Sequence, residues 1–283
     1  MMKEKTPSVP LSDSDLAKER ADPAQMRSEG ALREEDFGAF HLSALTVTEA
    51  ASHRFGRPAG RYLSLDFSPY LLFAEETAEE LAGALSAILA FFLSPLPSRV
   101  LVAGLGNRRL TADAYGPLTA EGITATAALP EKAGAFGLSP PVRTAVYVPD
   151  VLARTGIDSV QSVCAAARLA KAEALIAIDA LATAERENLL SVLEITDTGT
   201  VPGGGVKQGK EALSRASLGI PVTAIGLPTV VRADAAHFIV PRDLETGVAE
   251  LARITAHAIE LALSGHAPPP PFPLEELFSK EKP

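Results

Sequence analysis

The feature that most constrains the fold is an alternation of strand-like and helix-like runs between Thr46 and Gly265. Val100–Gly106 is an apolar run that ends in glycines, as a strand buried on both faces of a parallel sheet does. Segments with helical spacing separate it from similar runs downstream. This alternation predicts an α/β domain with a mostly parallel sheet sandwiched by helices. The further strand-like runs are 142–148, 174–178, 192–196, 221–225 and 237–240.

Three segments have the pattern of helices. Residues 155–171 carry apolar side chains at helical spacing, and residues 243–264 begin with an aspartate and stop before Gly265. The longest apolar run, Leu81–Leu93, is shorter than the ~20 apolar residues that a membrane span needs. We therefore expect a buried helix there and no membrane partner.

Composition divides the chain into three zones. Residues 1–45 are polar and charged, and we expect them to form an N-terminal extension: a mobile arm, a docking segment or a prosegment. Residues 46–266 are expected to form a single α/β domain. Residues 267–283 form a proline-rich tail, in which Pro268–Pro271 forbid helix and sheet pairing and Leu274–Phe278 is a candidate for docking on the body.

Charge and cysteine content exclude several classes of protein. The chain has 26 Lys and Arg against 35 Asp and Glu, a formal net charge of −9, so it repels phosphate backbones and we expect no direct nucleic-acid partner. Its one cysteine, Cys164, can form neither an internal disulfide nor a cysteine-rich zinc site. The N-terminus lacks the apolar core of a secretory signal, and we expect a cytoplasmic protein.

The residues that follow the strands are the first to consider for function, because ligands of such sheets bind beyond the carboxyl ends of the strands. Asp113 lies in the loop after the first buried strand. It is either a turn or N-cap aspartate, or a carboxylate of a functional site. Asn107 and Thr111 are candidates to orient it by hydrogen bonds, or they only stabilise the turn.

A second carboxylate, Asp179, directly ends the apolar run that begins at Leu175. It either caps a following helix over Ala180–Leu190 or is a carboxylate held at the active edge of the sheet. If the two strands are neighbours, Asp113 and Asp179 face each other. Two such carboxylates at close range share one proton, so that one activates water while the other donates to a carbonyl group.

A third acid, Asp197, precedes a loop of high glycine density over residues 201–210. Gly204–Lys210 has the skeleton of a phosphate-binding loop, but Glu211 stands where that motif needs Ser or Thr. We expect instead that Asp197 and the glycines of this loop position the main chain of a substrate, the alternative being a plain surface loop. The glycines meant are Gly203, Gly204 and Gly205.

Cofactor and metal chemistry find little support. Arg109 occupies the place of the third glycine of a dinucleotide-binding fingerprint, and the five histidines show no metal-ligand spacing. Cys164 lies among alanines and is expected to be a small buried apolar residue rather than a nucleophile. We expect neither a cofactor nor a required metal.

Four ordered blocks of sequence stand out together: Gly104–Asn107 with Thr111–Ala114 and Gly116–Pro117, Ala177–Ala182, Ile195–Gly199 with Pro202–Val206, and Leu218–Val231. These blocks together resemble the germination protease (spore protease) family. Weaker similarity extends back to Arg61–Asp66 and forward through the helix at 243–264, and the stretch Ser14–Glu19 resembles part of the family's processing region.

The resemblance implies an atypical aspartic endopeptidase that starts the degradation of small acid-soluble spore proteins during germination. Its two catalytic aspartates fall on Asp113 and Asp179 in this sequence. It further implies a zymogen that trims its own N-terminus, a homotetramer, no required metal, and a place in the cytoplasm of the forespore and the spore core. The fold is similar to that of hydrogenase maturation endopeptidases. A nickel-recognising enzyme of that type and a non-catalytic α/β binding module are the alternatives.

Overall fold

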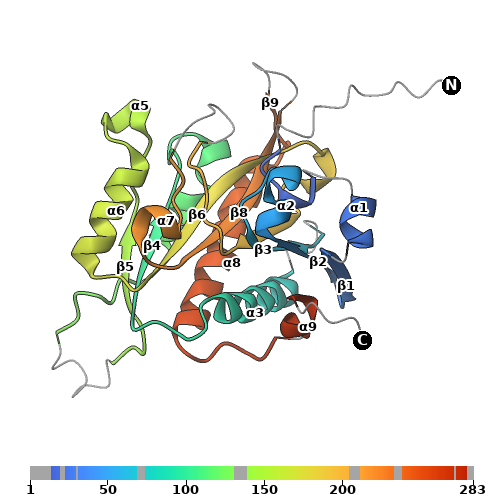
Figure 1. Ribbon diagram of the computed structural model, residues 1–283. Coiled ribbons are helices and arrows are strands. Elements are labelled where there is room, and N and C mark those ends of the chain that lie inside the picture. The colour runs from blue at the N-terminus through green and yellow to red at the C-terminus, as the bar shows by residue number, and fades with distance from the viewer. Residues whose placement is uncertain are drawn as a thin grey trace.

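The computed structural model describes residues 14–19, 23–29, 31–68, 74–130, 139–203, 211–232, 238–270 and 272–278. Within them, one nine-stranded sheet has helices on both faces (Figure 1), which confirms the predicted α/β class. The strands are β1 (Leu32–Phe37), β2 (Phe40–Val47), β3 (Gly60–Asp66), β4 (Arg99–Gly104), β5 (Arg143–Tyr147), β6 (Ala174–Thr183), β7 (Val192–Thr196), β8 (Val222–Arg232) and β9 (Phe238–Ile239).

The helices differ widely in length. The longest, α8 and α3, lie together, whereas several single turns connect strands. The α-helices are α1 (Pro23–Ser28), α2 (Glu49–Phe55), α3 (Glu75–Phe92), α4 (Tyr115–Glu121), α5 (Leu152–Thr155), α6 (Ser159–Ala170), α7 (Arg215–Leu218), α8 (Leu244–Leu263) and α9 (Leu274–Phe278); the 3₁₀ turns are η2 (Ala17–Glu19), η4 (Thr111–Asp113) and η6 (Arg186–Asn188). No helix of the described residues is long and apolar enough to cross a bilayer.

The sheet has a parallel half and an antiparallel half. Its strand order is β1-β2-β3-β7-β8-β6-β4-β5, and β9 pairs with β8. The pairs β4–β5, β4–β6 and β6–β8 are parallel, as predicted, while every pair from β8 to β1 is antiparallel. The expected mostly parallel sheet therefore describes only the half that contains β5, β4, β6 and β8.

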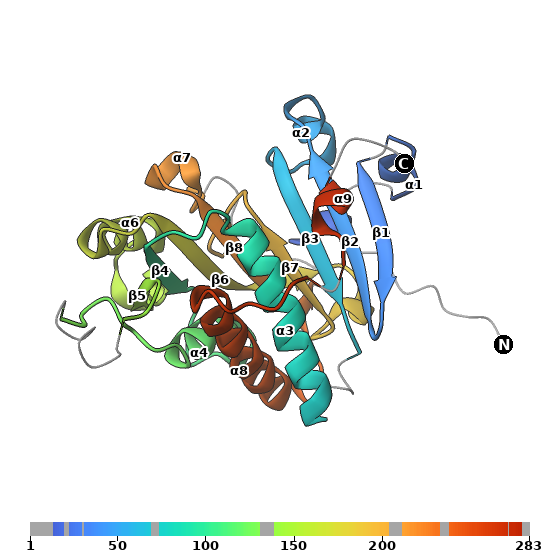
Figure 2. The same ribbon diagram turned by 90° about the horizontal axis from the view of Figure 1, so that it is seen from below.

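Each face of the sheet is covered by its own helices. Figure 2 shows α3, α4 and α8 gathered on one face, where they enclose the largest core cluster together with alternate residues of β4, β6, β7 and β8. On the other face, α6 and α7 cover the parallel strands, and α2 covers part of the antiparallel strands. The space between these two covers lies over β6, β7 and β8.

The predicted helices form with small shifts. The buried helix expected at Leu81–Leu93 is the C-terminal part of α3, and the helix expected at 243–264 is α8. The segment 155–171 contains α6, whose N-cap Asp158 accepts a hydrogen bond from the N–H of Gln161 at 3.0 Å. It starts later than predicted because Gly156 (φ 73°) ends the short helix α5 before it.

The helix proposed over Ala180–Leu190 as the alternative role for Asp179 is wrong. Strand β6 continues to Thr183, because the long strand β8 offers it a parallel partner through Val231. A helix cannot begin at Ala180 while its backbone takes part in this ladder. Only the turn η6 follows.

The predicted boundary between residues 45 and 46 falls inside β2. Part of the polar N-terminal zone belongs to the sheet, since β1 and β2 form an antiparallel hairpin within it. Sequence pattern missed β1 because only Leu32 is buried, while the side chains of its acidic residues 34–36 stay exposed. Backbone pairing to β2, rather than apolar burial, holds this edge strand. The prosegment itself stays a prediction.

The C-terminal tail docks on the body as expected. Phe272, Leu274 and Leu277 are buried, and Phe278 stacks on Phe91 of α3 with ring centroids 5.7 Å apart. The guanidinium of Arg33 in β1 donates a hydrogen bond to the carbonyl oxygen of Glu276 at 2.6 Å. The tail therefore joins α3 to the edge of the sheet.

Candidate active site

The two predicted aspartates, Asp113 and Asp179, line one pocket of about 710 Å³ on the face of the sheet between α7 and α2. We call it the aspartate pocket. Their strands are direct neighbours, as the prediction required: β4 and β6 pair in parallel, and the last pair joins Gly104 to Ile178. Asp179 is therefore the first residue of β6 beyond the end of β4, although β6 itself continues. The loop after β4 carries Asp113 to the same place. Sequence reasoning thus located both carboxylates at one end of adjacent strands.

The loop after β4 holds the carboxylate of Asp113 with main-chain groups. Its Oδ2 accepts a hydrogen bond from the N–H of Asn107 at 2.8 Å. Gly106 has φ 112°, and a Cβ there would lie 2.2 Å from the carbonyl oxygen of Asp113, so the close approach needs glycine. The side chain of Asn107 accepts from the N–H of Arg109 at 3.0 Å. Asn107 thus orients Asp113 through its backbone and stabilises the turn through its side chain.

The turn η4 is also fixed from β8. The hydroxyl of Thr229 donates to the carbonyl of Ala112 at 2.6 Å, and Thr229 is almost fully buried. It lies at an irregularity in the β6–β8 ladder that follows Pro228, which cannot donate to the ladder. Thr111 is exposed, and its carbonyl accepts from the N–H of residue 114. The sequence pointed to Thr111 as the orienting threonine, but the structure places Thr229 in the pocket lining.

Asp179 is only 6% exposed, so its carboxyl group is largely removed from water. Its Oδ1 accepts a hydrogen bond from the N–H of Ala180 at 3.0 Å. Gly116, at the start of α4, packs directly against this part of β6: a Cβ on it would lie 2.4 Å from the carbonyl oxygen of Ile178. The backbone of the loop that carries Asp113 and the backbone next to Asp179 are therefore in close contact.

A third carboxylate in the pocket, Glu194, was not predicted. In the ladders of β8, Asp179 and Glu194 are the partners of Gly226 on its two sides, so both side chains project from the same face of the sheet. Glu194 is 5% exposed and accepts a hydrogen bond from the N–H of Ala17 at 2.6 Å. Burial raises the pKa of Glu194, while the charge of Arg57 and the hydrogen bond from Ala17 oppose that rise. One sign of this site was present in the sequence: Glu194 is the single acidic residue in the apolar run 192–196.

Arg57 brings a cation into the same pocket. It follows Gly56, which ends α2 in the left-handed conformation (φ 60°). The phenol of Tyr62 donates to the carbonyl of Pro58 at 2.8 Å and fixes the next residue. Burial raises the pKa of Tyr62 to about 12, so this donor stays protonated. Nothing in the sequence around Arg57 distinguished it from a surface arginine.

The N-terminal segment 14–19 enters this pocket, and Asp15 is part of its lining. The N–H of Asp15 donates to the carbonyl of Ala182 at 2.8 Å, and its Oδ2 accepts from the N–H of Ala182 at 2.9 Å. The guanidinium of Arg57 donates to the carbonyl of Asp15. Leu16, the next residue, has no exposed surface. The segment thus contacts the end of β6 through Asp15, and its residues Ala17–Glu19 form the turn η2.

Two charged side chains anchor the end of that segment. The carboxylate of Glu19 accepts hydrogen bonds from the hydroxyl of Thr183 at 2.5 Å, from the N–H of Ala184 at 2.8 Å and from the amide of Asn188. The ammonium of Lys18 pairs with Asp66 of β3. Glu19 is buried although no cation pairs with it in these contacts, so neutral donors alone compensate its lost hydration.

The glycine-rich loop is only partly described. Gly203 lines the pocket with φ 61°, whereas Gly204 and Gly205, with the phosphate-loop skeleton, lie outside the described residues. Asp197 differs from the expectation: the pocket lining includes Thr196 and Thr198 but not the residue between them. Its two carboxylate oxygens accept from the N–H and the Nε of Arg61, both at 2.8 Å. Asp197 is thus engaged in joining β3 to β7.

Other reactive groups do not gather at the pocket. In the part of the chain that the structure describes, no three His, Cys, Asp or Glu side chains are grouped as metal ligands would be. Cys164 is half-buried on α6, and burial raises the pKa of its thiol. A thiol with a raised pKa is a poor nucleophile at neutral pH.

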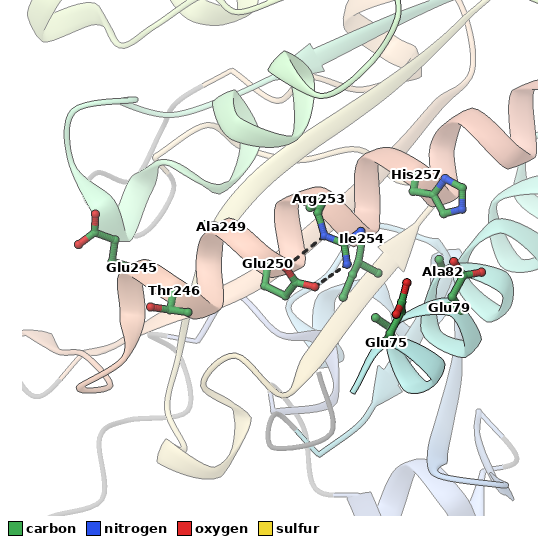
Figure 3. A pocket seen from close by; sticks show the side chains of 11 residues that line it. Glu75, Glu79, Ala82, Glu245, Thr246, Ala249, Glu250, Arg253, Ile254 and His257 are labelled. Atoms are coloured by element: carbon green, nitrogen blue, oxygen red, sulfur yellow. Dashed lines mark hydrogen bonds and ion pairs between the residues drawn. The ribbon is translucent and has the colours of Figure 1, made fainter. Parts of the chain in front are cut away.

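A second pocket, of about 840 Å³, lies between α3 and α8 (Figure 3). Glu250 and Arg253 of α8 form an ion pair of 2.6 Å along one side, and Glu75 and Glu79 of α3 stand opposite (Figure 3). These groups are at the surface, and Ala78, Ala82 and Ala249 contribute only small apolar side chains. We call this pocket the α3–α8 groove. It contains neither predicted aspartate.

Comparison with known proteins agrees with these observations. A family model described as germination protease matches residues 12–264. The chain belongs to the germination protease family. It is 33% identical over 214 residues to a germination protease of Bacillus cytotoxicus, which covers 71% of this chain and 56% of that protein. It is 32% identical over 230 residues to the germination protease of Bacillus subtilis, covering 77% of this chain and 60% of the other.

The chain thus spans little more than half of the length of these germination proteases. A [NiFe] hydrogenase maturation protease from Thermococcus kodakarensis is a distant structural match, with 16% identity and a TM-score of 0.38. The match covers 61% of this chain and 99% of the other.

Proposed function

We propose that this chain is an endopeptidase that starts the degradation of small acid-soluble spore proteins during spore germination, using Asp113 and Asp179. The observation that carries the proposal is that Asp179, in β6, and Asp113, in the loop that follows the adjacent parallel strand β4, line one pocket whose lining also includes Asp15 of the N-terminal segment. Membership in the germination protease family supports the same activity. The chain needs no cofactor for this chemistry.

The proposed mechanism uses the two aspartates as a pair. One ionised carboxylate takes a proton from water, whose oxygen attacks the peptide carbonyl carbon. The other, protonated, aspartate donates a hydrogen bond to the carbonyl oxygen, and the aspartate that took the proton from water passes it to the leaving nitrogen when the C–N bond breaks. Asp179 is buried and Asp113 is half-buried, and two carboxylates at close range can share one proton.

We further propose that the protein is made as a zymogen that trims its own N-terminus. Support comes from the segment 14–19, in which Asp15 forms part of the pocket wall and donates its main-chain N–H to the carbonyl of Ala182 in β6. A segment held in this way lies beside the two aspartates. Assembly as a homotetramer and a place in the cytoplasm of the forespore and spore core belong to the same proposal.

The test is incubation of the purified protein with a small acid-soluble spore protein, with and without a chelator, beside Asp113→Asn and Asp179→Asn. Mass spectrometry follows both the substrate fragments and the N-terminus of the protein itself. We expect chelator-resistant cutting that both variants lose while their circular dichroism stays that of the folded protein. Size-exclusion chromatography with light scattering determines whether the protein is a tetramer.

Other outcomes separate the alternatives. Cutting that a chelator abolishes and nickel restores would favour a metal-recognising enzyme of the hydrogenase maturation type. A folded protein that cuts nothing, and whose aspartate variants behave like the wild type, would favour a non-catalytic binding module. Either result would overturn the two-aspartate proposal.

A further inference from the structure

Arg57 has donors that the fold itself does not use. Its guanidinium lies in the aspartate pocket and donates to the main-chain carbonyl of Asp15. Its Nε is buried and has no hydrogen-bond partner among the described residues. A buried guanidinium N–H without a partner is costly, which makes such a group a candidate for contact with a ligand.

The contact with Asp15 selects one peptide bond of the N-terminal segment. A carbonyl oxygen that accepts from a guanidinium is polarised, so its carbon becomes more open to attack by water. Asp15 lines the pocket that Asp113 and Asp179 line. The bond between Asp15 and Leu16 therefore has a cation at its oxygen and shares its pocket with the carboxylate pair.

We propose that Arg57 is a third catalytic residue of this site, which holds the carbonyl oxygen of the peptide bond to be cut and stabilises the negative charge that develops on it. The proposal rests on the proposed two-aspartate function. The bond between Asp15 and Leu16 is its first substrate, and peptides bound in trans place the corresponding carbonyl against the same guanidinium.

The step balances without any further reactant. The water oxygen forms a bond to the carbonyl carbon, the water proton passes to the ionised aspartate, and the π electron pair moves onto the carbonyl oxygen. That oxygen has two lone pairs, so Arg57 and the protonated aspartate can both donate to it. When the C–N bond breaks, the double bond re-forms, and the leaving nitrogen takes a proton from the aspartate pair. The products are a carboxyl group and an amine.

The placement of Arg57 suits this role. Gly56 and the hydrogen bond from Tyr62 to Pro58 fix the backbone on both sides of it. Burial raises the pKa of Glu194 and the nearby charge of Arg57 opposes that rise, while the N–H of Ala17 donates a hydrogen bond to the Glu194 carboxylate. The guanidinium thus lies near Glu194, while the hydrogen bond to that carboxylate comes from a main-chain N–H group.

The kinetic test compares Arg57→Gln and Arg57→Lys with Arg54→Gln. Arg54 is an exposed cation on the same helix end, paired with Glu29 at the surface, and serves as the matched control. The rates measured are cleavage of the protein's own N-terminus and cleavage in trans of a synthetic peptide that contains residues 10–22. We expect Arg57→Gln to lower kcat by about 100-fold or more with a small change in KM. Lys should restore part of the loss, and Arg54→Gln should cut like the wild type.

A second measurement does not depend on cutting. Labelling with carbonyl-¹³C aspartate and ¹⁵N leucine marks only two peptide bonds, because Asp–Leu occurs only at 15–16 and 243–244. In the Asp179→Asn background, which preserves the bond, NMR reports the carbonyl shift of each. Arg57→Gln should move the Asp15 carbonyl resonance toward the position of a less polarised carbonyl and leave the Asp243 resonance in place.

The outcomes distinguish this proposal from the proposed function. Loss of cutting in Asp113→Asn with full cutting in Arg57→Gln would leave the peptidase intact and overturn the role of Arg57. That role is also overturned if Arg57→Gln raises only KM, or if the Asp15 carbonyl resonance does not move. If the wild type cuts nothing, both the proposed function and a catalytic role for Arg57 fall, and the NMR result then assigns Arg57 only an anchoring contact.

Discussion

The aspartate pocket and the α3–α8 groove are of similar size, about 710 and 840 Å³, but differ in how their charged groups are held. In the groove, Glu250 and Arg253 pair at the surface, where water screens them. In the aspartate pocket, Asp179 and Glu194 are nearly buried, and their carboxylates accept hydrogen bonds from main-chain N–H groups.

This difference in burial marks the aspartate pocket as a candidate functional site and the α3–α8 groove as a depression of the surface. Burial changes the protonation of an acid and strengthens its electrostatic interactions, whereas an exposed pair on one helix contributes little. The acids of the aspartate pocket also come from separate strands and loops, so the fold rather than one helix sets their geometry. Four predictions test this comparison, in order of decreasing effect.

The largest effect is expected for Gly116→Ala. A Cβ there would lie 2.3 Å from the carbonyl oxygen of Leu105 and 2.4 Å from that of Ile178, so backbone must move. We expect a loss of about 3 kcal/mol in the free energy of unfolding and loss of cleavage. The control, Gly83→Ala in α3, has only Pro268 at 3.9 Å and should be neutral or stabilising. Equal unfolding curves in urea for the two variants would contradict the comparison.

Glu19→Ala should have the next largest effect. It removes the carboxylate that accepts from Thr183, Ala184 and the buried amide of Asn188, and should cost about 2 kcal/mol in the free energy of unfolding. Release of the segment from the pocket should make the N-terminus more sensitive to a foreign protease in limited proteolysis. Glu79→Ala, an exposed acid of the α3–α8 groove, should change neither quantity. A protected N-terminus in Glu19→Ala would show that other contacts hold the segment.

Glu194→Gln should change the pH dependence of stability. Burial raises the pKa of Glu194 above its ordinary value of 4.5, so above pH 4.5 the folded state retains a proton that the unfolded chain loses. Glu194 thus contributes stability that is present below pH 4.5 and is lost as pH rises through the folded pKa. Glutamine keeps an acceptor for Ala17 but does not titrate. The free energy of unfolding, measured with urea from pH 4 to 8, should therefore fall less with rising pH in the variant than in the wild type. Parallel pH dependences of the two proteins would contradict this prediction.

The smallest effect is expected in the α3–α8 groove. Arg253→Gln removes the ion pair with Glu250, which lies at the surface and is screened by water. The free energy of unfolding should change by no more than about 0.5 kcal/mol, and peptide cleavage should stay at the wild-type rate. A loss of cleavage in this variant would mean that the two pockets are coupled.

Reasoning from sequence placed the two aspartates near each other, because their positions follow from strand order. Asp113 and Asp179 each come soon after an apolar run, and parallel strands bring such positions to one edge. Helices α3, α6 and α8 were recognisable because their apolar residues recur at helical spacing. These signals are local, so one chain suffices to reveal them.

The rest of the site depends on contacts between distant segments. Asp15 is hydrogen-bonded to Ala182, 167 positions away in the sequence, and Ala17 to Glu194, 177 positions away. No local sequence pattern predicts such contacts. In the sequence, Arg57 is not distinguishable from a surface arginine. Its place in the pocket lining depends on where α2 ends in the folded protein. Strand β1 was missed because its pairing uses backbone groups and needs few apolar side chains.

The pairing of β3 with β7 also fixes when the site can form during synthesis. Residues 32–66 contain the three antiparallel strands β1, β2 and β3, and the open edge of β3 pairs with Val192–Thr196, which leaves the ribosome much later. β7 in turn pairs with β8, which ends at Arg232. Non-local pairing of this kind is slow and follows the local elements. The antiparallel half of the sheet is therefore joined to the parallel half only after β7 and β8 have been synthesised.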